Sequence, residues 1–246
     1  MRKGLILFLV LVFPCLCFAQ EDSMGVEKKK KWHQRSLVKA AIVPVVLFGY
    51  GASTIQNHGL YSSYQAQRDI QKHFSGFKTQ IDDYLVFVPY AELVALNLLK
   101  IRCKNDFLNT GILIVKSELL MIALVYPMKY LVHLERPDQS GFNSFPSGHT
   151  AEAFLAATII HKEYQHKSLW PGLAAYAVAT SVGVLRMLNN VHWQSDVFAG
   201  AGIGILSAQI AYLTHRHRYH WSLGRNSCLV PTYRNGNVGF YYGLSF

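Results

Sequence analysis

Three short stretches of this chain carry side chains that can bind and cleave a phosphate ester. Residues 129–137 have the pattern Lys-x6-Arg-Pro, residues 146–149 read Pro-Ser-Gly-His, and residues 186–196 have the pattern Arg-x5-His-x3-Asp. Together they supply three cationic side chains, two imidazoles and one carboxylate. Because phosphoryl transfer is catalysed mainly by positioning and electrostatic stabilisation, such a set needs no metal ion or cofactor.

The cationic side chains and one predicted helix start are suited to holding the phosphate. Arginine offers a planar fork for two phosphate oxygens, and lysine adds a compact charge. These cations are Lys129, Arg136 and Arg186. The backbone N–H groups of Ser147, Gly148 and His149 precede a good helix-forming sequence, so we expect them at a helix N-terminus, where anions bind. Gly148 has no Cβ to block the approach of a ligand.

The third stretch indicates a nucleophile. His192 and Asp196 are four residues apart and share one face if a helix begins here. The Asp196 carboxylate can accept the Nδ1 proton of His192, which leaves Nε2 free to attack phosphorus. His149 can then protonate the departing oxygen. The inferred mechanism is a covalent phosphohistidine intermediate that water later hydrolyses.

Each stretch alone has an ordinary structural explanation. A single charged residue near a helix end is usually solvated, and Pro-Ser-Gly is typical of a turn followed by a helix cap. The presence of all three, in this order, favours a functional site.

The three stretches resemble the signature motifs of the type 2 phosphatidic acid phosphatase superfamily, over about residues 107–214. That superfamily includes membrane lipid phosphatases, soluble class A acid phosphatases and vanadium haloperoxidases. The resemblance implies His192 as nucleophile, Asp196 as its partner and His149 as general acid. It also implies these phosphate ligands: Lys129, Arg136, Ser147, Gly148 and Arg186. The family usually has serine before the third-motif arginine, where this chain has Leu185, so we expect one hydroxyl contact fewer.

The N-terminus predicts export. Residues 1–19 contain Arg2 and Lys3, then an apolar run, then Cys17-Phe18-Ala19, which is typical of a secretory signal cleaved after Ala19. An uncleaved anchor is the alternative, but the run is short for a spanning helix.

Basic residues suggest contact with a membrane surface. The formal net charge is +10, and residues 28–39 concentrate lysine and arginine just before the apolar stretch 40–50. Such a cluster suits anionic lipid head groups better than nucleic acid in an exported, apolar chain. Only Cys103 and Cys228 follow the signal segment, too few for a disulfide framework.

Apolar periodicity predicts an all-α, six-helix, membrane-associated bundle with a short C-terminal β-hairpin. The expected helices are 38–53, 84–100, 107–127, 149–161, 171–187 and 194–214. The stretch 54–82 is expected as an amphipathic helix or a long connection, and Asn235-Gly236 predicts the hairpin turn. We divide the chain into a signal peptide (1–19), a basic amphipathic membrane-proximal region (20–83), a helical phosphatase core (84–218) and a tail with the hairpin (219–246).

The bundle is expected to lie in the membrane, although a soluble bundle with buried apolar helices is the alternative. Half of the residues are hydrophobic (51%), and 194–214 is close to the roughly 20 residues that a span requires. Glu92, Lys116 and Glu118 fall inside expected helices and should therefore face the bundle interior, where Lys116 and Glu118 can pair with each other or with polar neighbours.

Loop charges predict the orientation. Basic residues gather in the connections that hold none of the three motifs, which predicts that these connections are cytoplasmic. They are Lys100, Arg102, Lys104, Lys162, Lys167, Arg216 and Arg218. The motif connections then face the periplasm. Since a cleaved signal places the mature N-terminus outside, 38–53 is expected to lie in the membrane interface without crossing.

These observations predict a metal-independent phosphatase of the bacterial inner membrane that acts on a lipid phosphate at the periplasmic face. Candidate substrates are lipid A phosphates, undecaprenyl pyrophosphate and phosphatidylglycerophosphate, with lipid A preferred by similarity to bacterial envelope members of the family. A soluble periplasmic class A acid phosphatase is an alternative, supported by the signal segment and by residues 192–196. A vanadate-dependent oxidase is disfavoured by the short chain, and a non-catalytic lipid-binding protein by the complete catalytic set. No nucleic-acid partner is expected.

Overall fold

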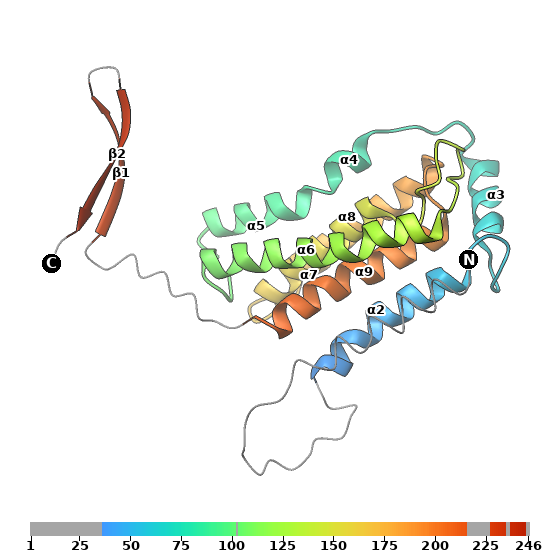
Figure 1. Cartoon of the computed structure of the whole chain (residues 1–246), viewed down its shortest axis with the longest axis horizontal. Coiled ribbons are helices and arrows are strands. Elements are labelled where there is room, and N and C mark those ends of the chain that lie inside the picture. Colours follow the sequence, from blue (N-terminus) through green and yellow to red (C-terminus); the bar gives the residue numbers. More distant parts are fainter. Residues whose placement is uncertain (1–35, 102, 216–226, 235–236, 245–246) are drawn as a thin grey trace, which may run out of the picture.

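The computed structural model describes residues 36–101, 103–215, 227–234 and 237–244. This part of the chain is mostly helical, as predicted (Figure 1). Its elements are α2 (Ser36–Ser53), α3 (Ser63–His73), α4 (Ile81–Leu85), α5 (Val88–Leu98), α6 (Phe107–Val132), α7 (Gly148–Tyr164), α8 (Trp170–Leu188), α9 (Gln194–Leu213), β1 (Ser227–Arg234) and β2 (Asn237–Leu244). The helices exceed the six expected, because α3 and α4 form between the first two of them. The predicted signal segment lies outside the described residues.

The two strands pair antiparallel, with Arg234 opposite Asn237. The residues of the expected turn, Asn235 and Gly236, lie outside the described residues, so the Asn-Gly turn stays a prediction.

Helix α7 lies at the centre of the bundle and packs against α8 and α9 (Figure 1). Most of its residues are buried, including Leu155, Ile159 and Tyr164. Gly204 of α9 allows the two backbones to meet, because a Cβ at this position would lie 2.1 Å from the carbonyl oxygen of Ala151 in α7. Small residues permit such close helix packing. The contact fixes the start of α7, which carries the second motif, against the helix that carries the end of the third.

We expect Gly204→Ala to destabilise the protein by about 1–3 kcal/mol, because the added methyl group must push α7 away from α9. The midpoint of thermal unfolding in detergent measures this effect. Gly111→Ala in α6 is the matched control, since its Cβ would meet no atom within 4 Å. Equal midpoints for the two variants would contradict the close packing of α7 on α9.

Helix α2 runs antiparallel to α9. Near its C-terminal end, the hydroxyl of Tyr50 accepts a hydrogen bond from Gln194 Nε2 at 2.7 Å. Further back along α2, the carbonyl oxygen of Pro44 would lie 2.6 Å from a Cβ added to Gly202. The two contacts place α2 lengthwise against α9. The expectation that 38–53 lies in the membrane interface stays a prediction.

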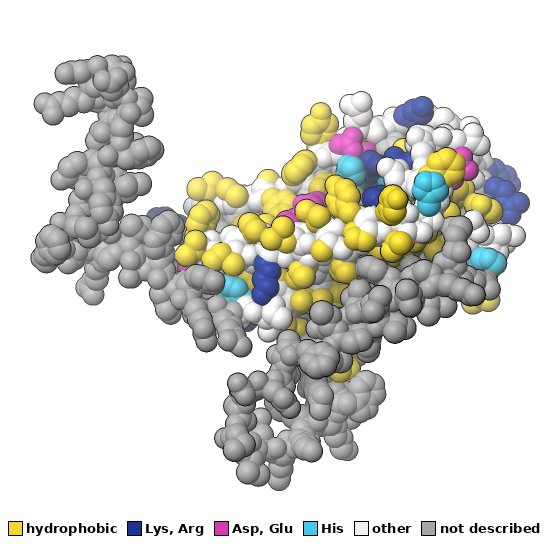
Figure 2. Space-filling model, in the orientation of Figure 1, with side chains coloured by type: hydrophobic (Ala, Val, Ile, Leu, Met, Phe, Trp, Pro, Cys, Tyr) yellow, Lys and Arg dark blue, Asp and Glu magenta, His cyan; other side chains and the backbone are white. Residues whose placement is uncertain are grey.

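Among the described residues, three helices are long and apolar enough to cross a membrane, namely α6, α8 and α9. Helix α6 also exposes a stripe of large apolar side chains at helical spacing, namely Val115, Leu119, Ile122 and Tyr126. Figure 2 shows hydrophobic side chains along the length of the bundle, whereas charged side chains gather at the end near α3 and α4. An extended apolar surface of this kind is suited to lipid.

A polar cluster lies within this apolar part of the bundle. Tyr90 of α5 donates a hydrogen bond to Glu118 of α6 and lies 3.0 Å from Glu152 Oε1 of α7. As expected, Glu118 therefore faces other helices, where it finds a polar partner. That partner is Tyr90, not Lys116.

Candidate active site

The third motif places His192 and Asp196 in contact. Helix α8 ends at Leu188 and α9 begins at Gln194, so His192 lies in the connection and Asp196 in the first turn of α9. The distance from His192 Nδ1 to Asp196 Oδ2 is 3.3 Å, and both side chains are buried. The pair forms without the continuous helix that the spacing suggested.

The Asp196 carboxylate is held by further donors. Its Oδ2 accepts hydrogen bonds from the Ser144 hydroxyl at 2.5 Å and from the Trp193 backbone N–H at 2.9 Å. The Trp193 bond caps the start of α9. Because the carboxylate is fixed on several sides, it can fix the imidazole of His192 in turn.

Burial controls the charge of His192. It lowers the pKa of the imidazole to about 4, and Lys129 and Arg186 act in the same direction while Asp196 opposes them. The ring is therefore neutral at pH 7. With its Nδ1 proton directed at Asp196, Nε2 carries the lone pair that a nucleophile requires.

The second motif begins α7. Ser147 is the N-cap residue, and its buried hydroxyl accepts hydrogen bonds from the backbone N–H and the hydroxyl of Thr150. The Ser147 backbone N–H donates to the carbonyl oxygen of Asp196 at 3.0 Å. This N–H is therefore not free for an anion as expected, and instead joins the second motif to the third. A Cβ added to Gly148 would meet no atom within 4 Å, so the space beside this backbone is open.

Two cationic side chains of the first motif bind the same residue, Asn143. Lys129, in the last turn of α6, donates from Nζ to the carbonyl oxygen of Asn143 at 2.6 Å. Arg136 donates from Nε to the side-chain oxygen of the same Asn143 at 2.9 Å. Asn143 therefore orders both cations, as a phosphate site requires.

Sequence reasoning overlooked Asn143 and Ser144, which precede the second motif. An asparagine and a serine beside a Pro-Ser-Gly turn are ordinary loop residues, and only their contacts show what they do.

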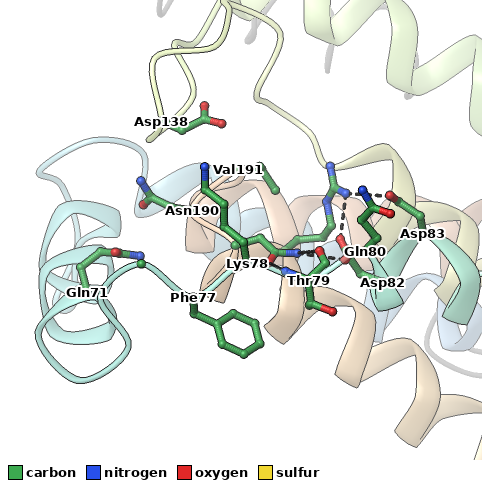
Figure 3. A pocket seen from close by; sticks show the side chains of 13 residues that line it. Gln71, Phe77, Lys78, Thr79, Gln80, Asp82, Asp83, Asp138, Asn190 and Val191 are labelled. Atoms are coloured by element: carbon green, nitrogen blue, oxygen red, sulfur yellow. Dashed lines mark hydrogen bonds and ion pairs between the residues drawn. The ribbon is translucent and has the colours of Figure 1, made fainter.

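The structure places two acidic residues of α4 against Arg186 and His149. Arg186 Nη1 lies 2.8 Å from Asp82 Oδ2 and 3.2 Å from Asp83 Oδ1. His149 Nε2 lies 3.0 Å from the same Asp83 Oδ1. Arg186 and His149 can therefore bind one oxygen atom together. Figure 3 shows Asp82 and Asp83, with dashed lines for their contacts to the other cavity-lining side chains drawn there.

Asn189, one residue beyond the end of α8, fixes Asp82. Its amide group donates to Asp82 Oδ1 at 2.9 Å and to the carbonyl oxygen of Thr79 at 2.9 Å, and its oxygen accepts from the Thr79 N–H at 2.8 Å. The segment before α4 is thereby joined to the end of α8. Sequence reasoning also missed this contribution, because it found no chemistry in residues 54–82.

A cavity of about 900 Å³ adjoins Arg186 (Figure 3). Most of the residues that line it have polar or charged side chains. The lining includes Gln71, Lys78, Gln80, Asp138, Asn189 and Asn190. The cavity can accept a polar group that extends from a bound phosphate.

Arg186 connects the two histidines. It lies close enough to His149 and to His192 to lower the pKa of both, and Lys129 has the same effect on His192. Arg136 joins the group through Asn143. The predicted cations and both histidines therefore belong to one cluster, whereas the Ser147 hydroxyl points into the protein. Among the described residues, no group of three or more His, Cys, Asp and Glu side chains is arranged to hold a metal ion.

Comparison with known proteins finds the family that the motifs resemble. Residues 111–220 match the model of the PAP2 superfamily. The lipid A 1-phosphatase of Porphyromonas gingivalis is 40% identical over 139 residues, which cover 55% of this chain and 31% of that protein. The bacitracin transport permease protein BcrC of Bacillus licheniformis is 39% identical over 72 residues, which cover 29% of this chain and 34% of that protein. The chain thus spans about a third of the length of these relatives.

Two solved structures resemble the fold at lower identity. The structure of Aquifex aeolicus LpxE is 23% identical, covers 65% of this chain and 99% of its own, and has a TM-score of 0.48. The transmembrane PAP2 type phosphatidylglycerolphosphate phosphatase of Bacillus subtilis is 22% identical, covers 72% of this chain and 99% of its own, and has a TM-score of 0.47.

Proposed function

We propose that this chain is a membrane phosphatase that hydrolyses lipid phosphate esters, because residues 111–220 match the model of the PAP2 superfamily. The observation that carries the proposal is the buried His192–Asp196 pair beside Lys129 and Arg186, at the end of three apolar helices. A neutral imidazole next to fixed positive charge is suited to attack a phosphate whose oxygens those cations hold.

The proposed reaction has two steps. The cations and the N–H groups at the start of α7 hold the phosphate. Nε2 of His192 then attacks phosphorus while the ester P–O bond breaks, and His149 gives its proton to the departing oxygen. Water next attacks the phosphohistidine, His149 takes a proton from that water, and phosphate and free His192 are regenerated. Asp196 keeps the attacking nitrogen unprotonated throughout.

A lipid A phosphate is the substrate we prefer. The relative that shares 40% identity is a lipid A 1-phosphatase, and the polar cavity beside Arg186 can accept a large polar head group. Undecaprenyl pyrophosphate and phosphatidylglycerophosphate carry less polar bulk next to the phosphate. The exposed apolar stripe on α6 argues against a soluble acid phosphatase.

Phosphate release from a panel of substrates in detergent tests the function. The panel contains lipid A, undecaprenyl pyrophosphate, phosphatidylglycerophosphate and the water-soluble ester glycerol phosphate, with a chelator present and His192→Ala as the blank. We expect lipid A to be hydrolysed fastest, and activity to survive the chelator because cationic side chains hold the phosphate. Equal turnover of glycerol phosphate and the lipids would favour an acid phosphatase.

The site is proposed to face the periplasm. Helices α6 and α8 end at the site and α9 begins there, so the connections 99–106 and 165–169 lie at the opposite end of the bundle. These connections and the N-terminal side of α2 carry the excess of lysine and arginine, which marks the cytoplasmic side. Cleavage after Ala19 does not fit this topology, since it would place the N-terminal end of α2 outside. Sequencing the N-terminus of the purified protein tests whether the chain is cleaved after Ala19.

Single cysteines in a cysteine-free background report the orientation. We expect Leu60→Cys and Ser140→Cys to react with an impermeant thiol reagent from the periplasmic side, because both positions lie at the end of the bundle that holds the site. Gln165→Cys, at the opposite end, should react only after the inner membrane is permeabilised. Different sidedness of positions 60 and 140 would contradict the fold, and early labelling of position 165 would reverse the orientation.

A further inference from the structure

We propose that Asp83 is a positioning residue that holds His149 as the proton donor. When substrate binds, the ester oxygen displaces the Asp83 carboxylate from His149. The inference rests on the proposed function and names a part of the site outside the three motifs. Its basis is the single oxygen, Asp83 Oδ1, that lies 3.0 Å from His149 Nε2 and 3.2 Å from Arg186 Nη1. An anionic oxygen between an imidazole and a guanidinium occupies the place that a phosphate ester needs.

Asp82 and Asp83 are neighbours with different roles. The Asp82 side chain is 1% exposed, and its two oxygens bind Arg186 and Asn189. Asp82 is therefore a fixed part of the cavity wall. The Asp83 side chain is 52% exposed, and the contacts described for it run through Oδ1 alone. Rotation of this one side chain into solvent frees both His149 and Arg186, while Asp82 keeps Arg186 in position.

The charges around His149 explain why such a partner is needed. Burial lowers the pKa of His149, and Arg186 of α8 lowers it further. Asp83 and Asp82 of α4 act in the opposite direction. A general acid must hold its proton when substrate arrives. Without Asp83, the ring would face Arg186 with less opposing charge and would lose its proton at a lower pH.

Over one catalytic cycle, His149 gives up one proton and takes back one proton. In the reactive form of the free enzyme, His149 is the doubly protonated imidazolium, and Asp83 Oδ1 accepts a hydrogen bond from its Nε2–H. The incoming phosphate replaces Asp83, bringing its own negative charge to Arg186 and its ester oxygen to His149. As the His192–phosphorus bond forms and the ester bond breaks, the proton moves from Nε2 to the leaving oxygen. The water that hydrolyses the phosphohistidine returns a proton to His149, and Asp83 then binds it again.

Asp83→Asn tests the inference in the full-length protein in detergent. The first measurement is the pH titration of the His149 ring by NMR with labelled histidine, assigned by comparison with His149→Gln. We expect its midpoint to fall by about one pH unit, since the variant removes an opposite charge within hydrogen-bond distance. The high-pH limb of the kcat/KM profile should shift to lower pH by the same amount, because activity is lost when His149 loses its proton.

The second measurement is inhibition by inorganic phosphate. We expect Asp83→Asn to bind phosphate at least as tightly as the wild type, because the variant removes a carboxylate that competes for Arg186. A merely structural role for Asp83 would instead weaken phosphate binding together with activity. Asp83→Glu, which keeps the charge, should restore most of the wild-type pH profile.

Asp69→Asn is the matched control, because Asp69 is an exposed carboxylate of α3 that accepts a hydrogen bond from Tyr61 and does not line the cavity. It should move neither the His149 titration nor the pH profile. An unchanged His149 midpoint in Asp83→Asn, or weaker phosphate binding, would overturn the inference. If the wild type hydrolyses no phosphate ester, the proposed function fails, but the titration still reports whether Asp83 holds the proton on His149.

Discussion

Replacement of His192 by alanine is expected to lower turnover of every phosphate ester by at least about 10³-fold and to abolish the trapped phosphoenzyme. The loss is large because the ring supplies the attacking atom, and removal of a nucleophile commonly eliminates most of the rate enhancement. Affinity for inorganic phosphate should change little, since Lys129, Arg136 and Arg186 remain. Rapid quenching into base, which preserves phosphohistidine, followed by measurement of protein-bound phosphate, gives the intermediate directly.

Two comparisons sharpen this expectation. Asp196→Asn should lower kcat by about 10²–10⁴-fold, because an amide in this place favours the wrong tautomer of His192 without removing the nucleophile. His166→Ala, in the exposed connection at the far end of the bundle, should match the wild type. A His192→Ala protein that still formed a phosphoenzyme would assign the attack to another residue.

Sequence spacing predicted the contact between His192 and Asp196 because its geometry is local. His192 and Asp196 are four residues apart, and a carboxylate in the first turn of a helix is a common cap, so their contact needs little tertiary information. The role of Asp82 could not be predicted in this way. It meets Arg186 across 104 residues of sequence, and only the packing of α4 against α8 brings them together.

Helix boundaries and helix placement were predictable to different degrees. The expected helix ended at residue 127, but α6 continues through Pro127 to Val132 and so carries Lys129 to the site. The stretch 54–82 contained a detectable signal for α3, since Ser62 and Gln65 form a capping box. Helix α2 was predicted as a helix, but its hydropathy did not predict that it packs lengthwise on α9. That packing depends on Gly202, which lets the two backbones meet.

The role of His149 is best tested by a change of leaving group. We expect His149→Gln to lower turnover of alkyl phosphate esters by about 10²–10⁴-fold, the usual contribution of a general acid. Hydrolysis of p-nitrophenyl phosphate should fall by only about tenfold, because p-nitrophenolate is a stable anion and departs without a proton. The measurement is the ratio of the two rates in the variant and in the wild type.

This ratio separates the two imidazoles by their chemistry. His192→Ala must lower both rates alike, since every ester requires the attack on phosphorus, whereas His149→Gln must lower one far more than the other. If His149→Gln slowed both esters equally and also weakened inhibition by phosphate, His149 would be a phosphate ligand and not the proton donor. Its position at the start of α7, within reach of the same oxygen as Arg186, would then serve binding alone.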